Sequence, residues 1–148
     1  MWSVPYFPHI YRQIRTRKCE IYPSDMRVKV SQTGKYTYPD LSIVCGTPQF
    51  DDEHKETLLN PKVIIEILSS STENYDKSEK FKQYWTIKSL SDYILIVQNE
   101  HQVQHFVRYA DNLWQVSRAT HLNELIRIAS IDCEITVEEI YEKVDSLI

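Results

Sequence analysis

The sequence predicts an α/β (α+β) fold in which helices flank one mixed β-sheet. An apolar run at 62–69 carries branched side chains on both alternating faces, which is typical of a central strand covered on both sides. Alternating runs precede and follow it, and helical spacing occurs after it and at the end of the chain. With 148 residues, the chain is expected to form a single domain over 1–148.

The segment before the central strand reads as a hairpin followed by a loop. Residues 19–30 and 36–46 are two β-runs, and the short connection between them offers Gly34 for a positive φ. Residues 47–60 are too charged for a core element, and their length predicts a mobile or functional loop.

A helix is expected directly after the central strand. Ser70 stands three residues before Glu73, which is the spacing of a capping box. The aromatic positions Phe81, Tyr84 and Trp85 continue the helical period. Their spacing favours core packing over the alternative, which is stacking on nucleic-acid bases.

Three strands and a second helix complete the predicted order. Runs at 92–98, 102–109 and 113–119 are separated by short polar turns and predict an antiparallel meander. Thr136 and Glu139 form a second capping-box pattern ahead of a helical apolar stripe. One helix on each face of the sheet is the expected packing.

Composition excludes several function classes. Only Gly34 and Gly46 occur, so the chain cannot build a G-x-G-x-x-G turn or a P-loop. The net charge of -4 provides no global basic field for DNA or anionic lipid, so any nucleic-acid contact must be local. No signal peptide or membrane span is recognisable, and no membrane partner is expected.

The cysteines are three and lie far apart. Cys19, Cys45 and Cys133 form no C-x-x-C pair of the kind that structural zinc sites use. We expect them to be reduced thiols in a cytoplasmic protein.

Two carboxylates are the candidates for chemistry. Glu66 lies in the middle of the buried run, where an ionised carboxylate costs several kcal/mol unless it is paired or binds a cation. Asp40 begins the preceding apolar run, directly after Pro39. Carboxylates from neighbouring strands suit Mg²⁺, which binds one or two of them and completes its shell with water and phosphate oxygens. The alternative is a hydrogen-bonded buried Glu and a strand-start Asp without a metal.

A lysine usually completes such a site by positioning or deprotonating water, or by neutralising charge on phosphoryl oxygens. None stands two residues after Glu66, but the following helix offers Lys77 and Lys80. Lys80 also has ordinary salt-bridge spacing to Asp76, so a solvated helix charge is the other interpretation.

The combination of these motifs resembles the Uma-type family of restriction endonucleases, a branch of the PD-(D/E)xK nuclease superfamily. The resemblance is carried by the Pro39-Asp40 pair, by the run VIIEILS at 63–69 and by the pattern Tyr75-Asp76-x-x-x-Lys80-x-x-x-Tyr84. The stretch YPSDMRVKV at 22–30 also matches, and the similarity extends to the last helix.

The resemblance implies a restriction-endonuclease-like sheet and a hydrolase that cuts DNA phosphodiester bonds with Mg²⁺, or Mn²⁺ as the alternative ion. It implies that Asp40 and Glu66 bind the metal, with Lys80 as the catalytic lysine and Lys77 as the fallback. Asp76 and Tyr84 are then supporting residues, and a homodimer is expected.

The N-terminal segment departs from the family pattern. Residues 1–18 are shorter than the helix and strand that bring a further Glu to the family's site, so a shortened or divergent segment is expected. This motivates the alternative function, a catalytically silent, truncated nuclease-fold module that binds nucleic acid or a protein. Affinity for a divalent metal separates the two functions.

Three other groups of residues are expected to be surface features. His101 and His105 flank a predicted turn, where their spacing defines no zinc pair. The acidic stretch 51–54 lacks the loop pattern of an EF-hand and reads as a solvated loop. The basic stretch 12–18 could contact phosphates or simply solubilise the terminus.

Overall fold

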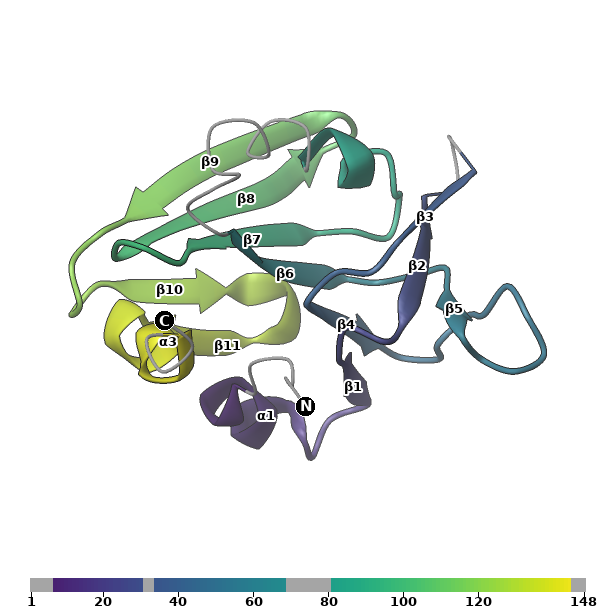
Figure 1. Cartoon of the computed structure of the whole chain (residues 1–148), viewed down its shortest axis with the longest axis horizontal. Helices are drawn as coiled ribbons and strands as arrows, with labels where there is room; N and C mark the ends of the chain where they lie inside the picture. The colour runs from purple at the N-terminus through teal and green to yellow at the C-terminus, as the bar shows by residue number, and fades with distance from the viewer. Residues whose placement is uncertain (1–6, 31–33, 69–80, 145–148) are drawn as a thin grey trace.

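A six-stranded mixed sheet forms the centre of the computed structural model, which describes residues 7–30, 34–68 and 81–144 (Figure 1). Its strand order is β1-β4-β6-β7-β8-β9. The strands are β1 (Cys19–Tyr22), β4 (Leu41–Cys45), β6 (Val63–Leu68), β7 (Asp92–Val97), β8 (Gln102–Ala110) and β9 (Leu113–Ala119). The predicted mixed sheet is therefore confirmed.

The predicted central strand, β6, occupies the middle of this sheet. It pairs antiparallel with β4 and parallel with β7, and β7, β8 and β9 then form the predicted antiparallel meander. Val63, Ile64 and Ile65 are completely or almost completely buried, as a strand covered on both faces requires.

The predicted hairpin is present, but each of its arms is divided between two sheets. β1 pairs with β4 in the main sheet, whereas β2 (Arg27–Val30) and β3 (Lys35–Thr37) pair in a separate three-stranded sheet with β5 (Thr57–Leu58). Pro23 and Pro39 lie at the two breaks, and proline has no N–H to continue a ladder. Gly34 supplies the expected positive φ, 72°.

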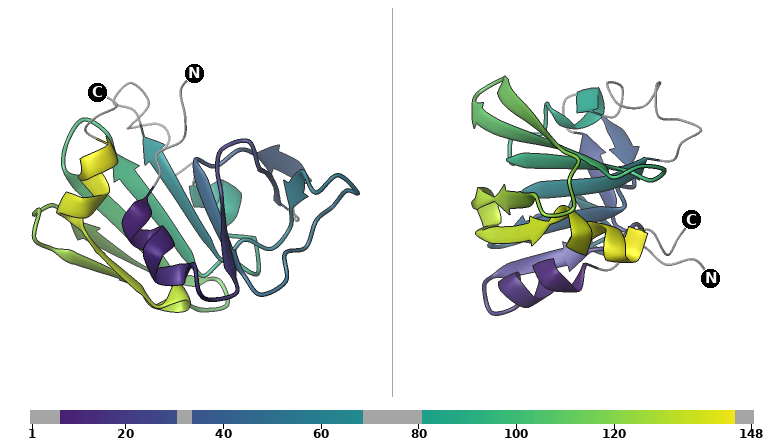
Figure 2. Two further views of the ribbon diagram at one scale, coloured as in Figure 1. Left: turned by 90° about the horizontal axis from the view of Figure 1, so that it is seen from below. Right: turned by 90° about the vertical axis from the view of Figure 1, so that its left-hand side faces the viewer.

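One face of the main sheet is covered by elements from both ends of the chain (Figure 2). These are α1 (Pro8–Ile14), the hairpin of β10 (Leu125–Ile128) and β11 (Cys133–Thr136), and α3 (Val137–Val144), with the short helix η2 (Ala129–Ile131) between the two hairpin strands. The capping box of α3 is confirmed, because Glu139 N–H donates to Thr136 Oγ1 at 3.1 Å and Thr136 N–H donates to Glu139 Oε1 at 2.9 Å.

The other face is covered by the three-stranded sheet and by residues 81–90. Tyr84, Ile87 and Leu90 pack there against Tyr93 and Leu95 of β7, together with Val28 and Leu58 of the small sheet. Residues 81–84 are helical, whereas the rest of the helix expected after the central strand lies outside the described residues.

The expectations for the cysteines and for His105 are wrong. Cys19 and Cys45, opposite each other on β1 and β4, form a disulfide, so only buried Cys133 is a free thiol. His105 is not on the surface: it is 7% exposed and its Nε2 lies 2.6 Å from Asp92 Oδ2, while Ser130 donates to Asp92 Oδ1 at 2.6 Å. The disulfide depends on the pairing of β1 with β4, and the contact of His105 with Asp92 depends on the pairing of β8 with β7. Neither strand pairing can be read from the residue spacing.

Candidate active site

Glu66 is positioned by β6 on the face that packs against residues 81–90. Ile64 and Leu68 share its side of the strand and belong to the hydrophobic cluster of that face. The Glu66 side chain is almost completely buried, because the residue is 3% exposed.

Two tyrosine hydroxyls hold the buried Glu66 carboxylate. Tyr84 donates to Oε1 at 2.7 Å and Tyr93 donates to Oε2 at 3.0 Å. Tyr84 lies in the helical turn over the sheet, and Tyr93 lies on the neighbouring strand β7. The partner that a carboxylate in this strand needs is therefore provided, at least in part, by a pair of phenols.

These phenols are strongly stabilised in their protonated form. Burial raises the pKa of Tyr84 and of Tyr93, and the negative charges of Glu66 and Asp40 raise both further. Each hydroxyl thus remains a hydrogen-bond donor at neutral pH, and both keep the orientation of the Glu66 carboxylate fixed.

Asp40 meets Glu66 through the pairing of β4 with β6. Leu41 lies opposite Ile65, so the continuation of this antiparallel register places Asp40 opposite Glu66. The Asp40 Oδ2 atom accepts the backbone N–H of Ile67 at 2.7 Å. The two carboxylates predicted from the sequence are thus brought to the same place on the sheet.

The donor chemistry of this pair fits a hard cation such as Mg²⁺. Two carboxylates on adjacent strands are the number of protein ligands that Mg²⁺ commonly takes. Within the three described ranges, no cluster of three or more His, Cys, Asp or Glu side chains offers an all-protein cage. Water and phosphate oxygens would complete the coordination.

The sequence-predicted residues fall into two groups. Asp40, Glu66 and Tyr84 are brought together, whereas Asp76, Lys77 and Lys80 lie outside the described residues. Tyr93 was not predicted, although one signal was available. It is the one residue with a hydroxyl group in the buried run 92–97, and a mid-strand Glu needs a hydrogen-bond donor.

The basic stretch 12–18 is partly used within the protein. Arg17 donates from Nη1 to the carbonyl of Ile131 at 2.7 Å and pairs with the Asp132 carboxylate at 3.5 Å. It therefore ties the segment after α1 to the end of η2. Arg12, Arg15 and Lys18 are exposed.

The described residues contain no helix long and apolar enough to cross a membrane.

Two curated proteins of Synechocystis sp., both named only as uncharacterized, are similar in sequence. One, sll1609, is 37% identical over 102 residues, which is 69% of this chain and 58% of the relative. The other, slr1290, is 30% identical over 123 residues, which is 83% of this chain and 63% of the relative. The chain thus spans about three fifths of the length of these relatives.

A solved structure shares the fold. It is described as a "putative nuclease belonging to DUF820" from Anabaena variabilis, and it matches with a TM-score of 0.72 and 16% identity over 93% of this chain and 76% of that chain. The model of the Uma2 family, described as "Putative restriction endonuclease", matches residues 8–138, which include α1, the whole main sheet and both carboxylates. The chain belongs to the Uma2 family.

Proposed function

We propose that the protein is a metal-dependent endonuclease that hydrolyses DNA phosphodiester bonds. The observation that supports this most is the meeting of Asp40 and Glu66 on adjacent strands of a chain that belongs to a restriction-endonuclease family. The sheet, α1 and α3 form the scaffold of what we take to be one domain.

In this proposal Asp40 and Glu66 hold Mg²⁺, with Mn²⁺ as the alternative ion. A bound cation of this kind polarises the phosphate and favours deprotonation of water. The Ile67 N–H orients Asp40, while Tyr84 and Tyr93 orient Glu66, so neighbouring donors fix both of the carboxylates that would hold the ion.

The remaining roles come from the family resemblance. Lys80, or Lys77 in its place, positions the attacking water or neutralises charge that develops on the phosphoryl oxygens. Asp76 supports the lysine. The resemblance also makes a homodimer the expected assembly.

Nicking of supercoiled plasmid tests this function. The wild-type chain with Mg²⁺ or Mn²⁺ is compared with Asp40→Asn and Glu66→Gln, and circular dichroism verifies that each variant is folded. We expect metal-dependent nicking by the wild type that falls at least about 100-fold in either variant, because each removes a charged metal ligand. Equal nicking by all three proteins, or none by folded wild type, would exclude the proposed enzyme.

A second function is favoured by the hydrogen bonds of Glu66 themselves. Both carboxylate oxygens accept a phenol hydroxyl, which is an arrangement that stabilises a buried carboxylate without any cation. A catalytically silent module that binds nucleic acid or a protein is the corresponding alternative. Such a module would bind DNA with the same affinity with and without divalent metal.

A further inference from the structure

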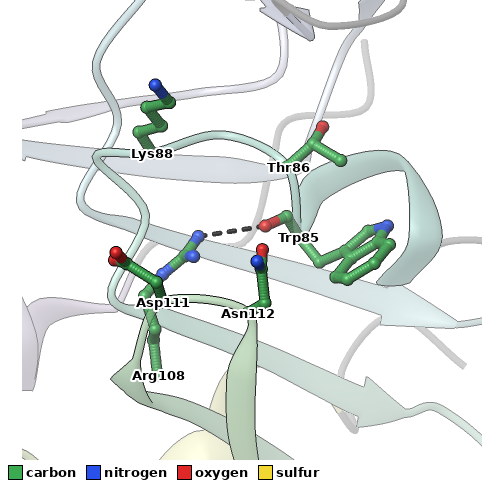
Figure 3. A pocket seen from close by; sticks show the side chains of 6 residues that line it. All are labelled: Trp85, Thr86, Lys88, Arg108, Asp111 and Asn112. Atoms are coloured by element: carbon green, nitrogen blue, oxygen red, sulfur yellow. Dashed lines mark hydrogen bonds between the residues drawn. The ribbon is translucent and has the colours of Figure 1, made fainter.

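A pocket lies between the turn that follows Tyr84 and the tip of the β8–β9 hairpin (Figure 3). It holds about 400 Å³ and is lined by Trp85, Thr86, Lys88, Arg108, Asp111 and Asn112. None of these residues takes part in the carboxylate site. The pocket is nevertheless linked to that site, because Trp85 directly follows Tyr84, which binds Glu66.

Arg108 fixes the walls of this pocket. Its Nη2 donates to the carbonyls of Trp85 at 3.0 Å and Ile87 at 2.8 Å, and its Nε donates to the carbonyl of Leu90 at 2.8 Å. The guanidinium also lies over the Trp114 ring, 4.4 Å from its centroid. The turn 85–90 is thus tied to β8, and the pocket is formed before any ligand arrives.

Trp85 presents an aromatic surface to solvent. Trp85 is 37% exposed, whereas its neighbour Tyr84 is 1% exposed and belongs to the core. The expectation that all three helical aromatics serve the core is therefore wrong for Trp85. The Trp85 backbone is held by the bond that its carbonyl accepts from Arg108, and the exposed indole offers a surface on which a base can stack.

Apart from the Asp111 carboxylate, which lies near Arg108, the other walls carry groups that can bind the edge of a base or a phosphate. Figure 3 shows the Trp85 indole on one side of the pocket, Lys88 and Asp111 on the other, and Asn112 between them. The Asn112 amide both donates and accepts hydrogen bonds, as the edge of a base does. Lys88 is exposed, and Arg108 Nη1 has no hydrogen-bond partner among the described residues, so both can donate to a phosphate.

We propose that this pocket binds one unpaired nucleotide of a DNA strand. The base stacks on Trp85 and meets the Asn112 amide with its edge, while the adjoining phosphate is bound by Lys88 and Arg108. The choice of DNA as ligand rests on the proposed function. The pocket would hold a strand that passes the carboxylate site, and it favours substrates with single-stranded or distorted segments.

Binding of a single-stranded oligodeoxynucleotide of about ten nucleotides, labelled at one end, tests the proposal by fluorescence anisotropy. EDTA is present, so cleavage does not contribute. We expect Trp85→Ala to weaken binding roughly ten-fold and Trp85→Phe to retain most of the affinity, because phenylalanine still offers a ring for stacking.

The salt dependence separates the charged contact from the stacking contact. Lys88→Gln should reduce the slope of log K against log salt concentration by about 0.7, the value for one phosphate contact of a single strand, and Trp85→Ala should leave the slope unchanged. Lys55→Gln is the matched control, because Lys55 is exposed in the loop before β5 and does not line the pocket. This variant should bind like the wild type.

Two outcomes would overturn the proposal: wild type that does not bind the oligonucleotide, or Trp85→Ala that binds it as tightly as wild type does. Plasmid nicking with the same preparations distinguishes failure of the nuclease proposal from failure of the nucleotide-pocket proposal. If the protein binds the oligonucleotide through Trp85 but does not nick plasmid, the nucleotide pocket stands and the nuclease proposal fails. If the Trp85→Ala and Lys88→Gln variants nick plasmid normally and bind the oligonucleotide with unchanged affinity, the nuclease proposal stands and the nucleotide pocket fails.

Discussion

At the scale of single residues, the buried carboxylate of Glu66 is the most demanding group in the molecule. An ionised carboxylate that is 3% exposed is stable only with partners, and two are the hydroxyls of Tyr84 and Tyr93. Removal of one partner leaves a buried oxygen with one hydrogen bond fewer. Each phenol therefore contributes to stability through Glu66 as well as through its own packing.

Tyr93→Phe should lower the free energy of unfolding by about 1–3 kcal/mol, the usual cost of depriving a buried polar group of its hydrogen bond. Urea denaturation followed by circular dichroism measures the change. Tyr109→Phe removes the hydroxyl of a 65% exposed tyrosine and serves as the control, with an expected change close to zero. Equal stabilities of the two variants would show that the Tyr93 hydroxyl does not support Glu66.

The two phenols also predict how stability depends on alkaline pH. Burial, and secondly the Glu66 charge, raise the pKa of Tyr84 and Tyr93 in the folded state, whereas an unfolded tyrosine ionises near pH 10. The unfolded chain therefore loses protons that the folded chain keeps. The stabilising contribution is complete below about pH 10 and decreases as the pH rises above it.

Denaturation series between about pH 8 and pH 11 test this dependence. We expect the free energy of unfolding to fall above about pH 10, and to fall less steeply in Tyr84→Phe by up to about 1.4 kcal/mol per pH unit, the linkage of one proton. The absorbance of tyrosinate verifies that the buried phenols ionise only on unfolding. Identical slopes for Tyr84→Phe and wild type would contradict the raised pKa.

At the scale of elements, α3 shows how a local sequence signal is used in the fold. The chain passes directly from β11 into the helix at Thr136, whose side chain and backbone exchange hydrogen bonds with Glu139. The capping box thus lies where β11 ends and α3 begins. Ile140 and Tyr141 of the helix then pack into the core of that face.

Thr136→Ala should lower the free energy of unfolding by about 1 kcal/mol, the typical value of an N-cap side chain. Glu138→Gln, an exposed substitution in the same turn, is the control and should have a smaller effect. Thermal or urea denaturation measures both. A Thr136→Ala protein as stable as the control would show that the capping box does not hold the start of α3.

The elements that could be predicted are those with a strong local pattern. The apolar run of β6, the three strands of the meander and the capped helix α3 were predicted correctly. α1, β5, β10 and β11 were missed because they are short, and because β10 and β11 are stabilised chiefly by pairing with each other. The division of the first hairpin between two sheets likewise depends on tertiary packing around Pro23 and Pro39.

At the scale of the whole molecule, a disulfide connects the edge strand β1 to β4, the strand that begins next to Asp40. Protein purified without reductant and unfolded in denaturant should therefore react with a thiol reagent at one cysteine, Cys133, and at three after reduction. Three reactive thiols before reduction would contradict the Cys19–Cys45 bond.

The candidate site could be predicted in part, because its two carboxylates stand out chemically. Asp40 and Glu66 were found from burial and from the family resemblance, and the register of β4 and β6 brings them together. The contact of Tyr93 with Glu66 depends on the register of β6 and β7, and the pocket at Trp85 arises where residues 85–88 lie against the tip of the β8–β9 hairpin, so residue spacing alone gives neither. The distances within these contacts exist only in the assembled molecule.

The most direct test of the central claim, that Asp40 and Glu66 form one divalent-cation site, is calorimetric titration of the purified chain with Mn²⁺. We predict one Mn²⁺ bound per chain, loss of that binding in Asp40→Asn and in Glu66→Gln, and no additional loss in the double variant, because both side chains serve the same ion. Unchanged Mn²⁺ binding in the folded single variants, or no binding by wild type, would contradict the account.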